Sequence, residues 1–335
     1  MLIVPDTNIL IAEPAVTSGP MAILLDYAHR TESRIILSAL VEDELLAYKT
    51  RYLKAHWDTY ARSAGVVRGF VQSIPQIPNA PDFESVAKAQ IGDLRKRLRI
   101  GDRDTLPVTE SHLRDAMRRA MRRIPPCTER GEEIRDAVLW IQVVELVRKN
   151  QPDSVAFVSA NVKQFASKDG NLLSALADEA RPGRLVYYES LDAFGKQHAT
   201  PIRFITREWL EERIANDKVF QRAESSLERL ARRAAGSSLG HAPTAIEGYG
   251  IDLDDFYVYE MEDGTLRVQA YWYGTLQVPG DELYDYDLNP LTGKHDYHYS
   301  ERDSESKDVE VIITIEAIVQ GQHMLGWEVI DVDRG

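Results

Sequence analysis

Five side chains suited to metal binding or acid–base chemistry are distributed around short apolar runs that are typical of buried strands: Asp6, Glu44, Asp136, Ser159 and Asn161. Asp6 comes just after residues 2–4, and Ser159 and Asn161 come just after residues 154–158. In an open α/β sheet, ligands bind in the crevice beyond the carboxyl ends of the strands. We therefore expect these five side chains to converge at one edge of a sheet.

Carboxylates that converge in this way raise one another's pKa values unless a cation lies between them. Asp6, Glu44 and Asp136 offer oxygen ligands, which suit Mg²⁺ or Mn²⁺ better than zinc. One or two such ions activate water for in-line attack on a phosphodiester. The three acids are therefore candidate metal ligands and catalytic residues.

Each of these acids also has a simpler interpretation. Glu44 suits the first turn of a helix, where an acid complements the helix dipole, and Glu42 or Asp43 could take its place. Asp136 could pair only with a neighbouring arginine, Arg135 or Arg130. Taken together, however, the positions favour a nuclease.

The segment Asp6-Thr7-Asn8 has further interpretations, because all three residue types begin helices. We expect Thr7 or Asn8 to cap a helix through residues 9–11. A carboxylate after a first strand also occurs in phosphoaspartyl phosphatases and receiver domains. The phosphatases need a second Asp two residues on, where this chain has Asn8.

The elements that must position these residues alternate along the first 200 positions. Strands are predicted at 2–4, 34–37, 154–158 and 184–188, and helical patterns at 22–29, 41–70, 83–100, 110–123 and 130–149. Such alternation predicts a mostly parallel sheet covered on both faces by helices. On the predicted helix 110–123, Arg114, Arg118 and Arg122 lie on one face. These arginines bind either an anionic partner or acidic side chains close to them in the sequence.

Beyond a linker-like segment at 234–243 the pattern changes to alternating strands, which predicts a small β-rich domain. Residues 245–335 hold 21 acids and 5 bases, a net charge of −16, whereas residues 1–244 hold 32 acids and 35 bases, or +3. One hypothesis is that the acidic domain docks on the basic helices at 94–123 and limits substrate access. The alternative is that it binds a protein partner.

The composition, with 44% hydrophobic and 28% charged residues, is that of a soluble globular protein. No apolar run approaches the roughly 20 residues that span a membrane. The single cysteine, Cys127, excludes an internal disulfide and fits a reducing compartment. We therefore expect a cytoplasmic protein without membrane contact.

Four segments, taken in order, resemble the motifs of PIN domains: Met1–Asn8, Ser38–Leu45, Gly131–Trp140 and Phe157–Phe165. The resemblance implies a Rossmann-like α/β/α sandwich over residues 1–200, with a helical insertion at about 70–125. A helical extension and linker at 201–244 and the acidic β-rich domain at 245–335 would follow. It also implies Mg²⁺- or Mn²⁺-dependent ribonuclease activity.

Carried over residue by residue, Asp6, Glu44 and Asp136 match the first three acids of the family. Many members have Asp at the fourth place, where this chain has Asn161, whose amide oxygen binds a metal or orients water but brings no charge. This departure weakens the case for a second metal. The remaining substrate-binding candidates are Thr7, Asn8, Arg135, Ser159 and Lys163.

The sequence thus predicts an endoribonuclease in which metal-activated water hydrolyses RNA, with single-stranded DNA as a further possible substrate. Two alternatives stay open. One is an inactive PIN-like module that binds RNA or protein, prompted by Asn161 and by Gln164, which stands where an Asp often precedes the Phe. The other is a DNA or flap nuclease that shares the same chemistry.

Overall fold

The computed structural model describes residues 1–13, 18–71, 78–127, 130, 133–151, 153–200, 202–234, 246, 248–278, 284–288, 295–299 and 307–334. It forms two compact units, Met1–Gln197 and His198–Gly335, which are described separately. Among the described helices, none is both long and apolar enough to cross a membrane.

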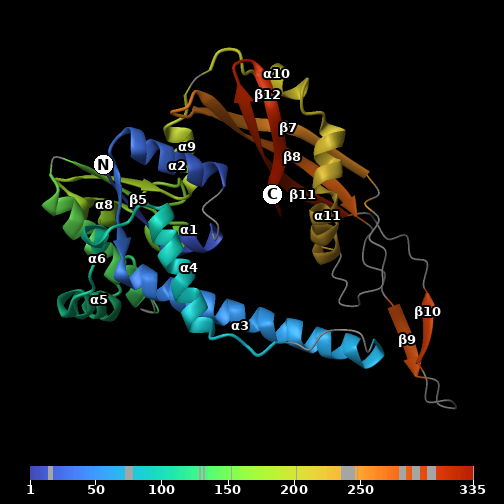
Figure 1. Ribbon diagram of the computed structural model, residues 1–335, viewed down its shortest axis with the longest axis horizontal. Helices are drawn as coiled ribbons and strands as arrows, with labels where there is room; N and C mark the ends of the chain where they lie inside the picture. Colours follow the sequence, from blue (N-terminus) through green and yellow to red (C-terminus); the bar gives the residue numbers. More distant parts are fainter. Residues whose placement is uncertain are drawn as a thin grey trace. The chain divides into compact units, whose positions relative to one another are not determined.

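The first unit is built on a four-stranded parallel sheet in the order β2-β1-β5-β6 (Figure 1). Its strands are β1 (Leu2–Pro5), β2 (Arg34–Ile35), β5 (Ser154–Val158) and β6 (Arg184–Tyr188). Ile3 of the central strand β1 pairs with Ile35 on one side and with Ala156 on the other. Because β1 is buried along its whole length, its sequence is continuously apolar rather than alternating.

Helices flank this sheet, as the alternating pattern predicts. They are α1 (Thr7–Ala12), α2 (Gly19–Arg30), α6 (Ile134–Lys149), α7 (Val162–Phe165), α8 (Ser174–Ala180) and α9 (Leu191–Gln197). Helices α2 and α9 pack against each other through the rings of Tyr27 and Phe194, which meet edge to face at 5.2 Å. The predicted parallel α/β architecture is confirmed.

Helix α3 (Ala39–Phe70) follows the second strand, and a helical insertion separates it from α6. The insertion comprises α4 (Phe83–Arg97), the 3₁₀ turn η1 (Asp102–Asp104) and α5 (Glu110–Arg122). The run 34–37, predicted as one strand, is instead divided between β2 and β3 (Leu37–Ser38). The two pieces have different partners, because β3 pairs with β4 (Thr105–Leu106) of the insertion, whereas β2 pairs with β1.

The second unit contains a four-stranded antiparallel sheet in the order β12-β11-β8-β7. Its strands are β7 (Gly248–Glu260), β8 (Thr265–Val278), β11 (Lys307–Gln320) and β12 (His323–Arg334), and β9 (Tyr284–Leu288) pairs with β10 (His295–Tyr299). Helices α10 (Arg207–Glu211) and α11 (Asn216–Ala234) share a hydrophobic core with this sheet. Residues assigned from sequence to an extension and linker therefore include helices that are integral to the β-rich unit.

Candidate active site

Asp6 lies at the carboxyl end of β1, buried with 6% of its surface exposed. It is the N-cap of α1, because its Oδ1 accepts a hydrogen bond from the backbone amide of Thr7 at 2.6 Å. The expectation that Thr7 or Asn8 caps this helix was wrong by one position. Strand β1 ends at Pro5 and α1 begins at Thr7, so Asp6 is the single residue between them and serves as the cap.

The segment after β5 supplies the other partner of Asp6. Ser159 is fully buried and its hydroxyl donates to Asp6 Oδ2 at 2.6 Å. The same hydroxyl accepts from the backbone amide of Asn161 at 3.2 Å, and the carbonyl of Ser159 accepts from the Tyr187 hydroxyl at 2.7 Å. Asn8 joins the two loops, since its Oδ1 accepts from the amide of Ala160 at 3.3 Å. The ends of β1 and β5 are thereby tied together.

Glu44 reaches this edge from the second turn of α3. One of its carboxylate oxygens accepts a hydrogen bond from the Thr7 hydroxyl, and the other lies 2.7 Å from Nη1 of Arg135. Glu42, the alternative candidate on the same helix, pairs instead with Arg95. The structure therefore brings Glu44, rather than Glu42, to Asp6.

Asp136 reaches the site from the first turn of α6. Its Oδ1 accepts a hydrogen bond from Nδ2 of Asn161 at 3.1 Å. In this arrangement the Asn161 side chain acts as a donor to a carboxylate. An aspartate at position 161 could not make this contact while both groups are ionised.

The electrostatics show that the three carboxylates share one environment. Burial, followed by the charges of Asp6 and Glu44, raises the pKa of Asp136 to about 6, although the hydrogen bond from Asn161 opposes this. Burial also raises the pKa of Asp6 despite its two hydrogen bonds, and Glu44 adds to the rise. Arg135, whose side chain is 76% exposed, lowers the pKa of both groups.

A buried polar contact joins the start of α3, which carries Glu44, to the middle of α6, which carries Asp136. Ser38 caps α3 by accepting from the amide of Leu40, and its hydroxyl donates to Oε1 of Gln142 on α6 at 2.7 Å. Gln142 in turn donates to the carbonyl of Pro107 at 3.0 Å. Sequence analysis missed Gln142, because a polar residue within an apolar helix pattern gives no sign of its partner.

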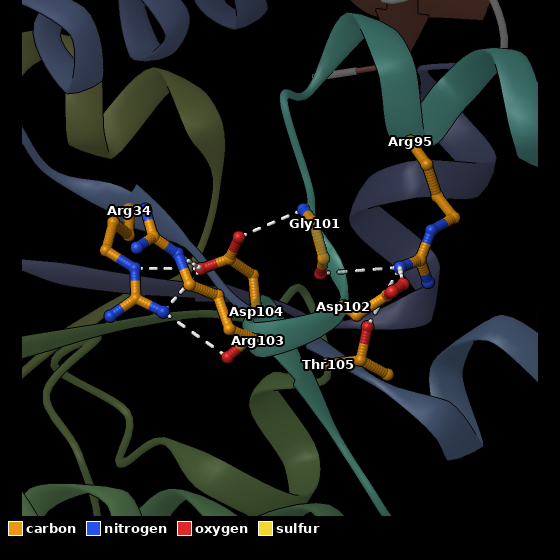
Figure 2. Close-up of polar contacts among 7 residues, drawn as sticks. All are labelled: Arg34, Arg95, Gly101, Asp102, Arg103, Asp104 and Thr105. Atoms are coloured by element: carbon orange, nitrogen blue, oxygen red, sulfur yellow. Dashed lines mark hydrogen bonds and ion pairs between the residues drawn. The ribbon is translucent and has the colours of Figure 1, made fainter.

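A second network anchors the insertion beside α3 (Figure 2). Asp104 is buried and accepts from Arg34 through Nε at 2.8 Å and through Nη2 at 2.5 Å, and its other oxygen accepts from the amide of Gly101 at 2.9 Å. Arg95 donates to Thr105 Oγ1 at 3.0 Å and to Glu42 at 2.7 Å. The start of α3, and with it Glu44, is therefore held against both the sheet and the insertion.

The donor set at this edge matches a divalent cation in kind. It contains three carboxylates, an amide and two hydroxyls, all oxygen donors of the type that Mg²⁺ and Mn²⁺ prefer, with one exposed arginine against three acids. In the arrangement described, however, no three His, Cys, Asp or Glu side chains among the described residues are gathered closely enough to hold a metal ion. Joint binding by all three acids requires Glu44 to turn away from Arg135.

The remaining predicted residues lie at the rim or away from it. Lys163 on α7 is exposed. On α5, Arg114 pairs with Glu110 at 2.7 Å and Arg118 with Asp115 at 3.0 Å, so local acids do neutralise two members of the arginine ladder. The hypothesis of an anionic partner on α5 stays a prediction.

Residues 3–165 match the family model of the PIN domain. The first unit contains a PIN domain. The matched range includes all the candidate residues and ends at Phe165, in the last of the four motifs. PIN domains are generally metal-dependent nucleases, so the match supports a nuclease-type module.

Among solved structures, the chain is similar to "VapBC2 from Rickettsia felis bound to a DNA fragment from their promoter". The identity is 10% and the TM-score 0.32, with 56% of this chain and 99% of the other covered. A search of curated proteins found no match. The assignment of the PIN domain therefore rests on the family model together with the parallel sheet.

Proposed function

We propose that the PIN domain of this protein is a Mg²⁺- or Mn²⁺-dependent endoribonuclease. The observation that carries the proposal is that Asp6, Glu44 and Asp136, from three separate elements, approach the carboxyl end of β1 closely enough for their charges to interact. Burial, together with repulsion from Asp6 and Glu44, raises the pKa of Asp136 to about 6. Such a cluster is costly for a folded protein unless a cation is bound, so the proposal explains why the acids are there.

Within this proposal, Asp6, Glu44 and Asp136 hold the cation and Asn161 assists. The bound ion supplies Lewis-acid polarisation of the phosphodiester and of water. Ser159 and the Thr7 amide fix the carboxylate of Asp6, so that this ligand is oriented in advance. Asn161 does the same for Asp136.

The substrate phosphates would contact the basic side chains at the rim of the site, Arg135 and Lys163. Arg135 is largely exposed although it pairs with Glu44, and Lys163 is exposed on α7. Release of Arg135 from Glu44 would make both the carboxylate and the guanidinium available, one for the metal and one for phosphate. Asn8 would hold the loop after β5 through the amide of Ala160, and Thr7 would hold Glu44.

The test is a cleavage assay with RNA and single-stranded DNA of the same sequence, with Mn²⁺, with Mg²⁺ and with EDTA. Wild type is compared with Asp6→Asn and Asp136→Asn, which keep the shape of each side chain. We expect metal-dependent cleavage of RNA by wild type and its loss by at least about 100-fold in both variants, as for removal of a key transition-state contact. Full activity in either variant would refute the assignment.

A second candidate is a PIN domain that binds RNA or protein without cleaving it. Two observations favour it: Asn161 replaces a carboxylate, and both oxygens of Glu44 are already engaged by Thr7 and Arg135. Calorimetry with Mn²⁺ separates the two functions. Binding at micromolar concentration supports the nuclease, and no heat at millimolar Mn²⁺ supports the binding module.

A further inference from the structure

The first half of α3 carries a row of aromatic rings that begins one turn beyond Glu44. Tyr48, Tyr52 and His56 follow Glu44 at intervals of four residues, so they lie along one side of the helix. The rings of Tyr48 and Tyr52 are stacked with centroids 5.8 Å apart, and those of Tyr52 and His56 are 4.2 Å apart. Tyr52 is 51% exposed, an unusual amount for a ring that only stabilises a core.

A pocket of about 130 Å³ lies beside this row, lined by Ile11 of α1, Tyr48, Lys49 and Tyr52 of α3, and Gln90 of α4. Helix α3 continues well beyond this point (Figure 1). Ile11 is four residues after Thr7, and Tyr48 is four residues after Glu44, and Thr7 donates to Glu44. The pocket is therefore about one helical turn, ~6 Å, from the candidate active site.

The same helix carries positive charge that its neighbours leave unneutralised. From Tyr48 to Phe70 it has five bases and one acid, Asp58. Within the described part of the chain, Lys49, Arg51 and Lys54 take part in no ion pair, in contrast to Arg114 and Arg118 of α5. Lys49 lines the same pocket as Tyr48 and Tyr52 and is partly buried, and this burial lowers its pKa. An anion at the pocket would compensate that burial.

We propose that Tyr48, Lys49, Tyr52 and His56, here named the α3 stacking surface, bind a single-stranded nucleic acid next to the site of cleavage. Unpaired bases stack on exposed aromatic rings, whereas the bases of a duplex are already stacked on one another. Lys49 contacts a phosphate of the same strand. The inference rests on the proposed function. It adds the course that the bound nucleic acid follows from the carboxylate cluster along α3.

The position of this surface also has a consequence for substrate length. A nucleic acid held only at Asp6, Glu44 and Asp136 would be anchored by the scissile phosphate and the nucleotides next to it. With the α3 stacking surface engaged, nucleotides on one side of the scissile bond add affinity. Very short oligonucleotides should therefore bind much more weakly than those of about ten nucleotides.

The test measures binding of fluorescein-labelled single-stranded RNA of about ten nucleotides to the full-length protein in EDTA, so that no cleavage occurs. Tyr52→Ala should raise Kd by roughly 5- to 150-fold, the range for loss of one stacked base. Tyr52→Phe, which keeps the ring, should stay within about 2-fold of wild type. A duplex of the same sequence should bind more weakly and be insensitive to Tyr52→Ala.

The matched control is Tyr60→Ala. Tyr60 continues the same four-residue spacing about two turns beyond Tyr52 and is 53% exposed. It is not among the residues that line the pocket, and its ring lies 5.7 Å from that of Trp57. Its loss should leave Kd unchanged. Circular dichroism of both variants checks that α3 remains folded.

Lys49→Gln provides an independent readout. For a single strand, each neutralised phosphate contributes about 0.7 to the slope of log Kobs against log salt concentration. We expect the slope to fall by about that amount in Lys49→Gln and to stay unchanged in Tyr52→Ala. This pattern separates a phosphate contact from a stacking contact.

The outcomes distinguish this inference from the proposed function. If wild type cleaves RNA but Tyr52→Ala binds as tightly as wild type, or if Tyr60→Ala weakens binding equally, the stacking surface is overturned and the nuclease stands. If wild type binds as predicted without cleaving, the surface stands and the nuclease fails. No binding by wild type would overturn the surface, and the nuclease would then be decided by the cleavage assay alone.

Discussion

Nδ2 of Asn161 donates a hydrogen bond to Oδ1 of Asp136, with 3.1 Å between the two atoms. The contact joins the loop after β5 to the first turn of α6, across 25 residues of sequence. It also settles what the amide at position 161 does in this structure, where the family often has an acid. An amide there stabilises the ionised form of Asp136, whereas an acid would oppose it.

The first prediction concerns that amide. Asn161→Asp removes the donor and adds a fourth negative charge, so without divalent cations the free energy of unfolding at pH 8 should fall by about 1–3 kcal/mol. With saturating Mn²⁺ the variant should recover more stability than wild type does. Thermal unfolding with and without Mn²⁺ measures both effects. Asn171→Asp, an equal change at an exposed position, is the control, and an equal Mn²⁺ shift in wild type and Asn161→Asp would contradict the prediction.

The second prediction is a pH dependence of stability. The pKa of Asp136 is about 6 in the folded protein, above its ordinary value of 3.8. The folded chain therefore binds this proton more tightly than the unfolded chain does, and the resulting stabilisation is complete below pH 3.8 and lost as the pH rises through 6.

Asp136→Asn should therefore stabilise the protein at pH 8 and change little at pH 4. The full shift corresponds to roughly 3 kcal/mol, but partial exposure of Asp136 reduces the expected gain to about 1–2 kcal/mol. Urea unfolding in EDTA at the two pH values is the measurement. Asp93→Asn, at an exposed position of α4, should show no such difference, and a gain that is the same at both pH values would argue against the carboxylate cluster.

The third prediction concerns the anchor of the insertion (Figure 2). Arg34 on β2 holds the buried Asp104 through two hydrogen bonds, although the arginine side chain is itself 41% exposed. A double-mutant cycle of Arg34→Met and Asp104→Ala should give a coupling energy of about 1.5–3 kcal/mol, as for hydrogen bonds between charged groups. The exposed pair Lys88–Glu84 is the control and should couple by less than about 1 kcal/mol.

The fourth prediction concerns the second unit, His198–Gly335, here called the acidic unit because it includes the acidic residues 245–335. Because α10 and α11 belong to its core, a deletion that begins at residue 245 would leave their apolar faces uncovered. The appropriate truncation is residues 1–197, which hold 26 acids and 27 bases and leave 27 acids and 13 bases in the second unit.

If the acidic unit limits access of RNA, residues 1–197 should cleave faster than the full chain at low salt. We expect a gain of roughly 3- to 10-fold that disappears at high salt, because screening weakens long-range repulsion. Initial rates over a salt series measure this gain. Equal rates and equal salt dependence would leave the unit with a different role, such as binding a protein partner.

The parallel sheet was predictable because strands buried on both faces must be continuously apolar, as at residues 2–4, and because 154–158 and 184–188 lie between helical patterns. The last of these is an edge strand with residues of alternating exposure. The hairpin that joins β7 to β8 also has a local signal, the pair Asp263-Gly264, which is common in tight hairpin turns. Its turn residue Gly264 has φ +78°, which glycine adopts without strain. By contrast, the division of 34–37 into β2 and β3 depends on Thr105 and Leu106, about 70 residues away, and no local pattern reveals such a partner.

The sequence by itself determined that Asp6, Glu44 and Asp136 would approach one edge of a sheet, because the ends of parallel strands meet there. Only the tertiary structure decided how their oxygens are used: Ser159 and Thr7 on Asp6, Arg135 and Thr7 on Glu44, and Asn161 on Asp136. It alone also revealed that Tyr48 and Tyr52 line a pocket one turn from Glu44. The positions of strands follow from local apolar patterns, whereas side-chain partners depend on three-dimensional packing between residues that are remote in the chain.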